Sequence, residues 1–291
     1  MLPVHLGLPS VRPPQRSTAA PVEPTTGRRP AFAGLVDGFG RVATDLRVSL
    51  TDRCNLRCSY CMPEHGLDWL PTDKTLSDQE VIRLVTIAVT RLGVREVRFT
   101  GGEPLLRRGL ESIVTATSAL RLADGSRVKT SLTTNGLGLA HRASVLAASG
   151  LARVNVSLDT LDPRRYARIT RRDRFGDVIA GLAAARAAGL GPIKVNAVLL
   201  RGVNDDEAVP LARWALAEGY QLRFIEQMPL GPPSAGARDE MVTAREILDA
   251  LRGAMDLLPM DQAARGASPA QVWTARTKDG FRGTVGVIAS V

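Results

Sequence analysis

The chain has 291 residues, 44% of them hydrophobic, which is enough apolar material for one large core or for one domain with an appendage. No apolar run approaches the ~20 residues that span a bilayer, so we expect no membrane partner. The net charge is +9, and most of the positive residues are arginines. We therefore expect an anionic small ligand, although a compositional bias of the organism would also explain the arginines. Aromatic residues make up only 4%, so we expect no nucleic acid.

Residues 1–35 are predicted to form a disordered leader, because Pro, Ser, Thr and Ala dominate this stretch without any apolar period. Prolines and arginines interrupt it before the apolar core of a secretory signal could form. Since the sequence also lacks an exported disulfide framework, we expect a reducing compartment and therefore a cytoplasmic protein.

Residues 36–230 alternate between short β-branched runs and amphipathic stretches of helical period. This alternation predicts parallel strands joined by right-handed crossovers. The fold class is therefore α/β, and six repeats predict a partial (β/α)6 TIM-like barrel. The predicted strands are 46–50, 96–100, 128–133, 153–158, 193–199 and 221–226, and the predicted helices are 78–92, 109–122, 139–149, 176–188 and 205–218.

All three cysteines lie directly after the first predicted strand, in Cys54-Asn-Leu-Arg-Cys58-Ser-Tyr-Cys61. Three thiolates cannot pair off into disulfides, and they are one ligand short of a closed zinc site. They can hold three irons of a four-iron cluster, which leaves the fourth iron open to a ligand that is not protein. The spacing predicts a reactive [4Fe–4S] cluster with Cys54, Cys58 and Cys61 as its metal ligands.

Two other uses of these cysteines remain open. A zinc site would have to borrow a histidine, and His65 is near enough in sequence to serve. A redox pair could use Cys58 and Cys61, but Cys54 would then have no role. The cluster uses all three.

Two adjacent glycines follow the second predicted strand, in Gly101-Gly-Glu-Pro104. Glycines at a strand end let a ligand approach the backbone closely, although alone they could mark a simple turn. In α/β barrels the chemistry lies at the C-terminal ends of the strands, where both this segment and the cysteines fall. We therefore predict one ligand site at that edge.

After residue 230 the alternation ends, and residues 231–291 are predicted to form an incomplete C-terminal extension. Gly231-Pro-Pro-Ser-Ala-Gly predicts a loop, and 243–251 a short helix. Residues 271–275 and 282–289 predict a β-hairpin.

The cysteines and Gly-Gly-Glu-Pro together resemble the radical S-adenosylmethionine (SAM) superfamily. The wider segment from Asp45 to Pro63 is more specific and resembles the GTP 3′,8-cyclase family, whose lyases perform the first step of molybdenum cofactor biosynthesis. The resemblance covers roughly residues 40 to 291. Further segments match that family in order and spacing, namely Thr133-Thr-Asn-Gly136, Asn155-Val-Ser-Leu-Asp-Thr160, Lys194-Val-Asn-Ala197 and Arg223-Phe-Ile-Glu-Gln-Met-Pro229.

The resemblance implies roles for particular side chains in a barrel of the radical SAM type. The three cysteines would hold the cluster, and SAM would bind its open iron. Single residues have simpler alternatives: Arg98 or Lys194 could be ion-paired with Glu226 or Asp159, Met228 could fill the core, and Ser157 could be a small buried hydroxyl. The implied SAM contacts are Tyr60, Gly102, Ser157 and Met228, and the implied GTP contacts are Arg47, Arg98, Thr133 and Lys194.

The implied reaction is reductive cleavage of SAM to a 5′-deoxyadenosyl radical, which abstracts hydrogen from C3′ of GTP so that the ribose radical adds to C8. No catalytic acid–base pair is needed for this step. The implied partners are GTP, a protein reductant for the cluster, and the downstream cyclic pyranopterin monophosphate synthase. The oligomeric state stays open, with a homodimer as one option.

The sequence departs from the family in one respect. The family holds a second cluster with three further cysteines near its C-terminus, whereas no cysteine follows Cys61 here. We therefore expect a truncated or fragmentary member that keeps SAM cleavage and loses the site that orients GTP. The alternatives are a peptide-modifying radical SAM enzyme, a non-catalytic remnant that bears the cluster, and a zinc-binding module.

Overall fold

The computed structural model describes residues 34–36, 42–228, 241–261 and 270–290. Most of the predicted leader and the loop predicted at 231–236 lie outside these residues. The division into a leader, residues 36–230 and an extension stays a prediction. Among the described residues, no helix is both long and apolar enough to cross a membrane.

In the part of the chain that the structure describes, nine strands form one sheet in the order β3-β4-β5-β6-β7-β8-β11-β10-β9. The strands from β3 to β11 run parallel, and β10 and β9 continue the sheet in antiparallel pairing. Two short strands, β1 (Leu35–Val36) and β2 (Val42–Ala43), pair separately. The strands of the large sheet are β3 (Asp45–Ser49), β4 (Glu96–Thr100), β5 (Lys129–Thr134), β6 (Arg153–Ser157), β7 (Lys194–Val198), β8 (Gln221–Ile225), β9 (Met255–Pro259), β10 (Gln271–Thr277) and β11 (Arg282–Ile288).

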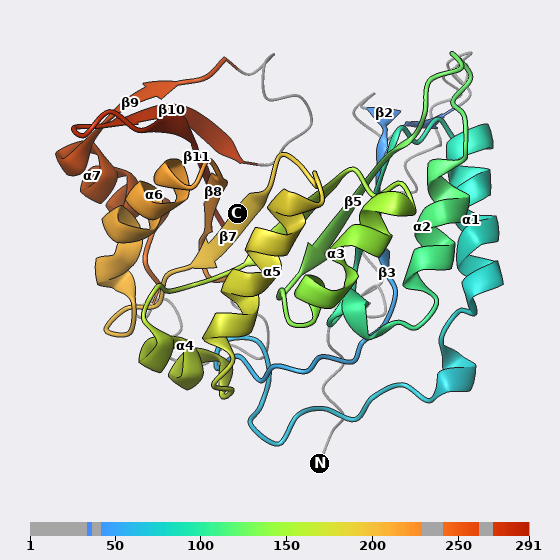
Figure 1. The fold of residues 1–291 in the computed structure, drawn as a ribbon, viewed down its shortest axis with the longest axis horizontal. Coiled ribbons are helices and arrows are strands. Elements are labelled where there is room, and N and C mark those ends of the chain that lie inside the picture. The colour runs from blue at the N-terminus through green and yellow to red at the C-terminus, as the bar shows by residue number, and fades with distance from the viewer. Residues whose placement is uncertain (1–33, 37–41, 229–240, 262–269, 291) are drawn as a thin grey trace, which may run out of the picture.

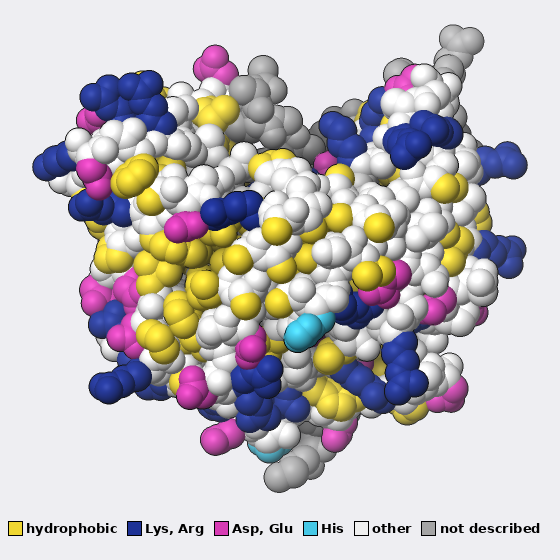
Figure 2. Space-filling view, in the orientation of Figure 1, with side chains coloured by type: hydrophobic (Ala, Val, Ile, Leu, Met, Phe, Trp, Pro, Cys, Tyr) yellow, Lys and Arg dark blue, Asp and Glu magenta, His cyan; other side chains and the backbone are white. Residues whose placement is uncertain are grey.

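Helices follow the strands along the chain and, in Figure 1, succeed one another from α1 at one side of the molecule to α6 and α7 at the other. Their buried residues share one hydrophobic cluster with the strands. Lys and Arg side chains stand out mainly around the margins of the same view (Figure 2). The helices are α1 (Asp78–Arg91), α2 (Leu110–Ser118), α3 (Leu139–Ala148), α4 (Pro163–Thr170), α5 (Phe175–Ala187), α6 (Ala208–Ala217) and α7 (Ala244–Ala254), with short 3-10 turns η1 (Thr72–Lys74), η2 (Pro104–Leu106) and η3 (Asp205–Glu207).

Alternation along each strand gives the sheet two chemically different faces. On the helix side lie side chains such as Val97, Phe99 and Phe224, all fully buried. The residues between them, such as Arg98 and Arg223, therefore project to the opposite face, which we call the inner face. The inner face therefore carries charged side chains, whereas the helix side is apolar.

The α/β architecture of six consecutive strand–helix units is confirmed. A capping box of Ser77 and Glu80 begins α1. The predicted second helix is too long, because α2 ends at Ser118 and the chain then turns back through a bridge between Arg121 and Arg127.

Helix α4 was not predicted, because its arginines mask the apolar period. Its start is nevertheless readable from Asp162, whose carboxylate accepts the N–H groups of Arg164 and Arg165, followed by Pro163 in the first turn. The predicted C-terminal hairpin forms as β10 and β11. Its parallel pairing with β8, which joins it to the main sheet, was not foreseen.

Candidate active site

The predicted GTP residues come from four strands, and the sheet places them on the inner face. Arg47 of β3 lies opposite Arg98 of β4 in the strand register. Asn155 of β6 lies between Thr133 of β5 and Lys194 of β7. Their side chains therefore share one surface although 147 positions separate Arg47 from Lys194.

Four cationic side chains on the inner face lie near enough to affect one another. The pKa of Lys194 is lowered to about 8, first by burial and then by the charges of Arg223, Arg153 and Arg98. Burial followed by the charges of Arg98 and Arg153 lowers the pKa of Arg223 to about 10. An anion bound among these groups would relieve the repulsion.

One carboxylate, Glu96, offsets part of this charge. It forms a close ion pair with Arg153, and its Oε1 lies 3.8 Å from an Nη2 of Arg98. The Nε of Arg98 is buried without a hydrogen-bond partner among the described residues. The Nε of Arg98 is therefore able to donate a hydrogen bond to a ligand, and guanidinium groups bind phosphate well.

The ion pairs considered as alternatives for Arg98 and Lys194 do not form. The carboxylate of Glu226 instead accepts the N–H groups of Ala244 and Ser290. The carboxylate of Asp159 accepts the hydroxyl of Tyr60 and the N–H of Val198.

Sequence reasoning missed Arg153 and Arg223 as members of this cluster. Arg223 is 8% exposed, and its Nε donates a 3.0 Å hydrogen bond to the Oδ1 of Asn196 on β7. Arg153 could have been found from its own strand, because it lies four residues before Ser157 on β6 and alternate residues share a face. Arg223 lies on β8 opposite Asn196 of β7, and only the strand register shows that.

The cysteine loop follows β3 and is held by the end of α4. The N–H groups of Arg57 and Ser59 donate to the carbonyl oxygens of Thr170 and Ile169, at 3.0 and 2.9 Å. Within the loop, the Cys58 carbonyl accepts the N–H of Cys61 at 2.9 Å. The unpredicted helix α4 is therefore the element that supports the cysteines.

The three thiols suit an iron–sulfur cluster. Cys54 and Cys58 are partly buried, and Cys61 is exposed. Burial raises the pKa of Cys58 far above its ordinary value, and the charges of Asp159, Cys61 and Cys54 raise it further. Bound iron would supply the positive charge that stabilises three neighbouring thiolates. Within the described residues, no group of three or more His, Cys, Asp or Glu side chains has the geometry of a site for one metal ion.

The two glycines of Gly101-Gly-Glu-Pro104 pack against the cysteine loop. The N–H of Gly102 donates to the Thr51 carbonyl at 2.6 Å, and that of Glu103 to the Arg53 carbonyl at 2.7 Å. A Cβ on Gly102 would collide with the carbonyl oxygens of Asp52 and Arg53. Close approach of two backbones is thus one physical reason for glycine at this position.

Glu103 of the same segment is fully buried and turns away from solvent. Its carboxylate accepts the hydroxyl of Thr134 and the N–H of Asn135, both at 2.7 Å, and the N–H of Leu105 at 2.9 Å. Burial outweighs these hydrogen bonds and raises its pKa to about 6. Glu103 joins the loops that follow β4 and β5 and does not present its carboxylate to a ligand.

The four predicted SAM contacts come from different segments near the C-terminal edge of the sheet. Tyr60 belongs to the cysteine loop, Gly102 follows β4, Ser157 ends β6, and Met228 lies just after β8. Met228 is 47% exposed, so the alternative that it fills the core is wrong.

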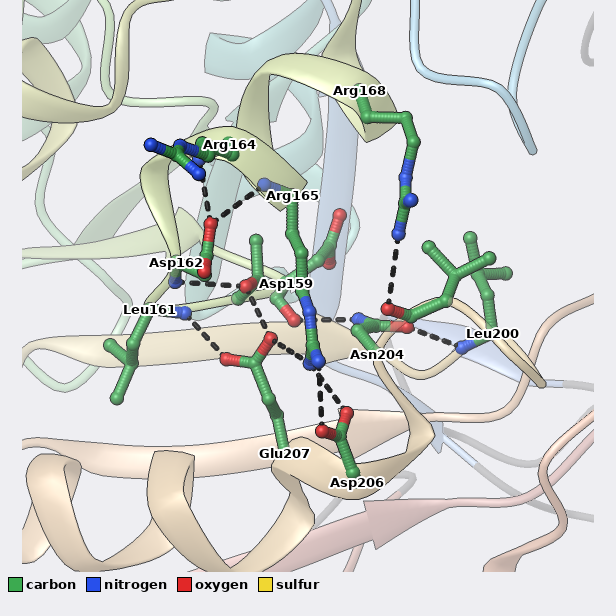
Figure 3. Close-up of polar contacts among 12 residues, drawn as sticks. Asp159, Leu161, Asp162, Arg164, Arg165, Arg168, Leu200, Asn204, Asp206 and Glu207 are labelled. Carbon is green, nitrogen blue, oxygen red and sulfur yellow. Dashed lines mark hydrogen bonds and ion pairs between the residues drawn. The ribbon is translucent and has the colours of Figure 1, made fainter.

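Asp159 connects the cysteine loop with the ends of β6 and β7. Its Oδ2 accepts the Tyr60 hydroxyl at 2.8 Å, and its Oδ1 accepts the Val198 N–H at 2.9 Å. Its backbone carbonyl accepts Nδ2 of Asn204 at 2.7 Å (Figure 3). Burial raises the pKa of the Asp159 carboxyl to about 6.

A second buried carboxylate, Glu207, completes this polar network. It accepts the Thr160 hydroxyl at 2.5 Å, the Leu161 N–H at 2.7 Å and Nη1 of Arg165 at 2.9 Å. Arg165 lies on α4 and also pairs with Asp206, as Figure 3 shows. Because α4 supports the cysteine loop, the network couples the loops after β6 and β7 to the cysteines.

Comparison with known proteins shows the family to which the chain belongs. The family model of the radical SAM superfamily matches residues 48–215, more than half of the chain. Among solved structures, Streptococcus suis SuiB bound to its precursor peptide SuiA superposes with a TM-score of 0.56 at 18% identity over 72% of this chain and 45% of that one. The structure of anSMEcpe with bound AdoMet superposes with a TM-score of 0.56 at 16% identity, over 72% of this chain and 56% of that one. The chain belongs to the radical SAM superfamily.

Much closer relatives define its place within that superfamily. A GTP 3′,8-cyclase of Corynebacterium glutamicum is 55% identical over 95% of this chain and 74% of its own length. One from a Mycobacterium species is 57% identical over 98% of the chain and 76% of its own length, and one from Streptomyces coelicolor is 58% identical over 88% and 73%. The chain is therefore a member of the GTP 3′,8-cyclase family, and the likeness to SuiB and anSMEcpe reflects the shared fold alone.

Proposed function

We propose that this chain is a radical SAM GTP 3′,8-cyclase, which converts GTP to (8S)-3′,8-cyclo-7,8-dihydroguanosine 5′-triphosphate in the first step of molybdopterin biosynthesis. The observation that carries the proposal is the identity of 55% and 57% to the GTP 3′,8-cyclases of Corynebacterium glutamicum and a Mycobacterium species over nearly the whole chain. The cation cluster of the inner face supports GTP as the ligand, because a triphosphate supplies the negative charge that the cluster lacks.

Cys54, Cys58 and Cys61 would hold a [4Fe–4S] cluster. When bound and reduced, such a cluster supplies the electron that splits SAM. The chain's own contribution is placement: α4, Asp159 and Gly102 fix the cysteine loop at the C-terminal edge of the sheet, beside the inner face. Placement of this kind is the usual task of the protein when a cofactor carries the chemistry.

Within this proposal Tyr60, Gly102, Ser157 and Met228 contact SAM. Each comes from a loop or strand end at the edge that carries the cysteines. The GTP contacts are Arg47, Arg98, Thr133 and Lys194. Arg98 supplies a guanidinium with an unsatisfied Nε, and Lys194 a half-buried ammonium. Arg47 is exposed, next to Arg98, where it can reach a ligand from the rim.

The proposal extends to partners and location. A protein reductant is required because each SAM cleavage consumes one electron. The product is chemically suited to a cyclic pyranopterin monophosphate synthase downstream. Cytoplasmic location is supported by unpaired cysteines, which survive best in a reducing compartment. The oligomeric state stays open, with a homodimer as one option.

Calorimetric titration of GTP into the anaerobically reconstituted chain tests the substrate assignment. Lys194→Ala should weaken GTP binding by about tenfold, or ~1.4 kcal/mol. Lys278→Ala is the matched control, since Lys278 is exposed on the turn after β10, and it should leave the affinity unchanged. A parent chain that binds SAM but no GTP would overturn the assignment and favour the peptide-modifying alternative.

A further inference from the structure

The side chain of Asn135 reaches a cysteine that the proposed function makes a cluster ligand. Asn135 directly follows β5, and its Nδ2 lies 3.8 Å from the Sγ of Cys54, within hydrogen-bonding range for sulfur. The same amide nitrogen donates a 2.7 Å hydrogen bond to the Oδ1 of Asn55. Its two hydrogens thus serve two neighbouring acceptors on the cysteine loop.

The orientation of this amide is determined by its other contacts. The Oδ1 of Asn135 accepts the N–H of Leu137 at 2.9 Å, so the oxygen end is occupied within its own loop. The backbone N–H of Asn135 donates to the Oε2 of Glu103 at 2.7 Å. Because oxygen would be repelled by the thiolate and has a donor elsewhere, the nitrogen end is the one that faces Cys54.

Cys54 also receives a backbone donor. The N–H of Leu56 lies 3.5 Å from its Sγ. That hydrogen bond belongs to the turn and cannot be removed by a side-chain substitution. The hydrogen bond from the Asn135 side chain can be removed by substitution, so the effect of that hydrogen bond on the sulfur can be measured.

We propose that Asn135 is a positioning residue that raises the reduction potential of the cluster through its N–H···S hydrogen bond to Cys54. A reduced cluster carries one more negative charge than an oxidised one, and its sulfurs are then better hydrogen-bond acceptors. An N–H donor therefore stabilises the reduced form more than the oxidised form, and hydrogen bonds to the sulfurs are one of the factors that set cluster potentials. The inference rests on the proposed function only in that the cysteine loop holds a [4Fe–4S] cluster.

The test is a potentiometric titration of the reconstituted cluster without SAM, followed by electron paramagnetic resonance. Asn135→Ala removes the donor. Asn135→Ser also removes the donor, because the shorter neutral side chain no longer reaches Cys54, but it keeps an oxygen that can accept from Leu137, so it preserves the loop if the Ala variant does not retain iron. Asn55→Ala is the matched control, because it removes the other partner of the same amide and leaves the hydrogen bond to Cys54.

We expect the midpoint potential of both Asn135 variants to be more negative than that of the parent chain, by ~59 mV. For a one-electron couple this shift corresponds to about a tenfold change in the ratio of reduced to oxidised cluster. The Asn55 variant should keep the midpoint of the parent chain. An unchanged midpoint in both Asn135 variants would overturn the proposal, and so would an equal shift in Asn55→Ala, which would indicate displacement of the loop. A parent chain that takes up no cluster would instead refute the proposed function itself.

Discussion

The hydroxyl of Tyr60 donates a 2.8 Å hydrogen bond to the Oδ2 of Asp159, which is only 6% exposed. This contact ties the middle of the cysteine loop to the segment that follows β6. The carboxylate also accepts the N–H of Val198, the last residue of β7, so one buried group connects the ends of three strands. The position of the cysteines therefore depends on residues far away in sequence.

Tyr60→Phe removes that hydrogen bond and leaves a buried carboxylate oxygen without its donor. We expect a loss of ~1–3 kcal/mol in the free energy of unfolding, measured by urea denaturation of the chain. Tyr166→Phe is the matched control, because the Tyr166 hydroxyl is buried without a hydrogen-bond partner among the described residues. Its removal should cost nothing or stabilise the fold. Equal effects of the two substitutions would contradict the assigned role of Tyr60.

Lys194 should make GTP binding depend on pH. Its pKa is lowered to about 8 in the free protein by burial and neighbouring arginines, and a bound triphosphate would raise it. Affinity for GTP should therefore fall as the pH rises above about 8, because binding then requires uptake of a proton. Calorimetry at pH values on both sides of 8, in buffers of different ionisation enthalpy, measures that uptake.

The same depressed pKa has an opposite consequence for the stability of the ligand-free protein. Between about 8 and the ordinary value of 10.5, the unfolded chain binds more protons at this residue than the folded chain does. The unfavourable contribution of Lys194 is therefore fully present below pH 8 and is relieved as the pH rises. A Lys194→Met variant should show neither effect, and a variant that retains the full pH dependence of GTP affinity would assign it to another group.

Gly102→Ala should displace the cysteine loop. The new Cβ would collide with the carbonyl oxygens of Asp52 and Arg53, which are backbone atoms and cannot rotate away. We expect a loss of ~1–3 kcal/mol of stability together with reduced iron uptake. Gly253→Ala, inside α7 with nothing within 4 Å of the added carbon, should stabilise the fold slightly. Normal iron content and stability in Gly102→Ala would show that the contact is not needed.

The buried carboxylate of Glu207 should matter far more than a comparable surface one. Glu207→Ala leaves Arg165, Thr160 and Leu161 without their shared acceptor, and we expect a loss of ~3 kcal/mol. Glu218 is a suitable comparison, since it pairs with Arg186 at 2.7 Å where both side chains are at least 42% exposed. Glu218→Ala should cost less than ~1 kcal/mol. Thermal and urea unfolding of both variants give the comparison, and similar losses would argue against a structural role for the network of Figure 3.

Much of the fold could be predicted because strand–helix alternation is a local signal. Strand β4 runs from Glu96 to Thr100, as predicted from its β-branched and aromatic run. The cysteines and Gly101-Gly102 were also readable, because their spacing lies within short segments. Helix α4 was missed because its arginines mask the apolar period. Arg223 was missed because its place beside Asn196 depends on how distant strands align, which no local pattern reveals.

The network around Asp159 and Glu207 was unpredictable for the same reason. Asp159 was considered as an ion-pair partner for Arg98 or Lys194, whereas the structure gives it the hydroxyl of Tyr60. Asp159 is buried, and a buried carboxylate accepts hydrogen bonds from nearby backbone and side-chain donors because water is not available to it.

The formation of 5′-deoxyadenosine tests the central claim most directly. The chain is reconstituted anaerobically with iron and sulfide, given SAM and dithionite, and the nucleoside is measured by chromatography beside the iron content. One cluster on three cysteines predicts about four irons per chain and 5′-deoxyadenosine, and Cys58→Ser should lose both. A chain that carries four irons and yields no 5′-deoxyadenosine, or one that takes up a single zinc instead of iron, would contradict the account.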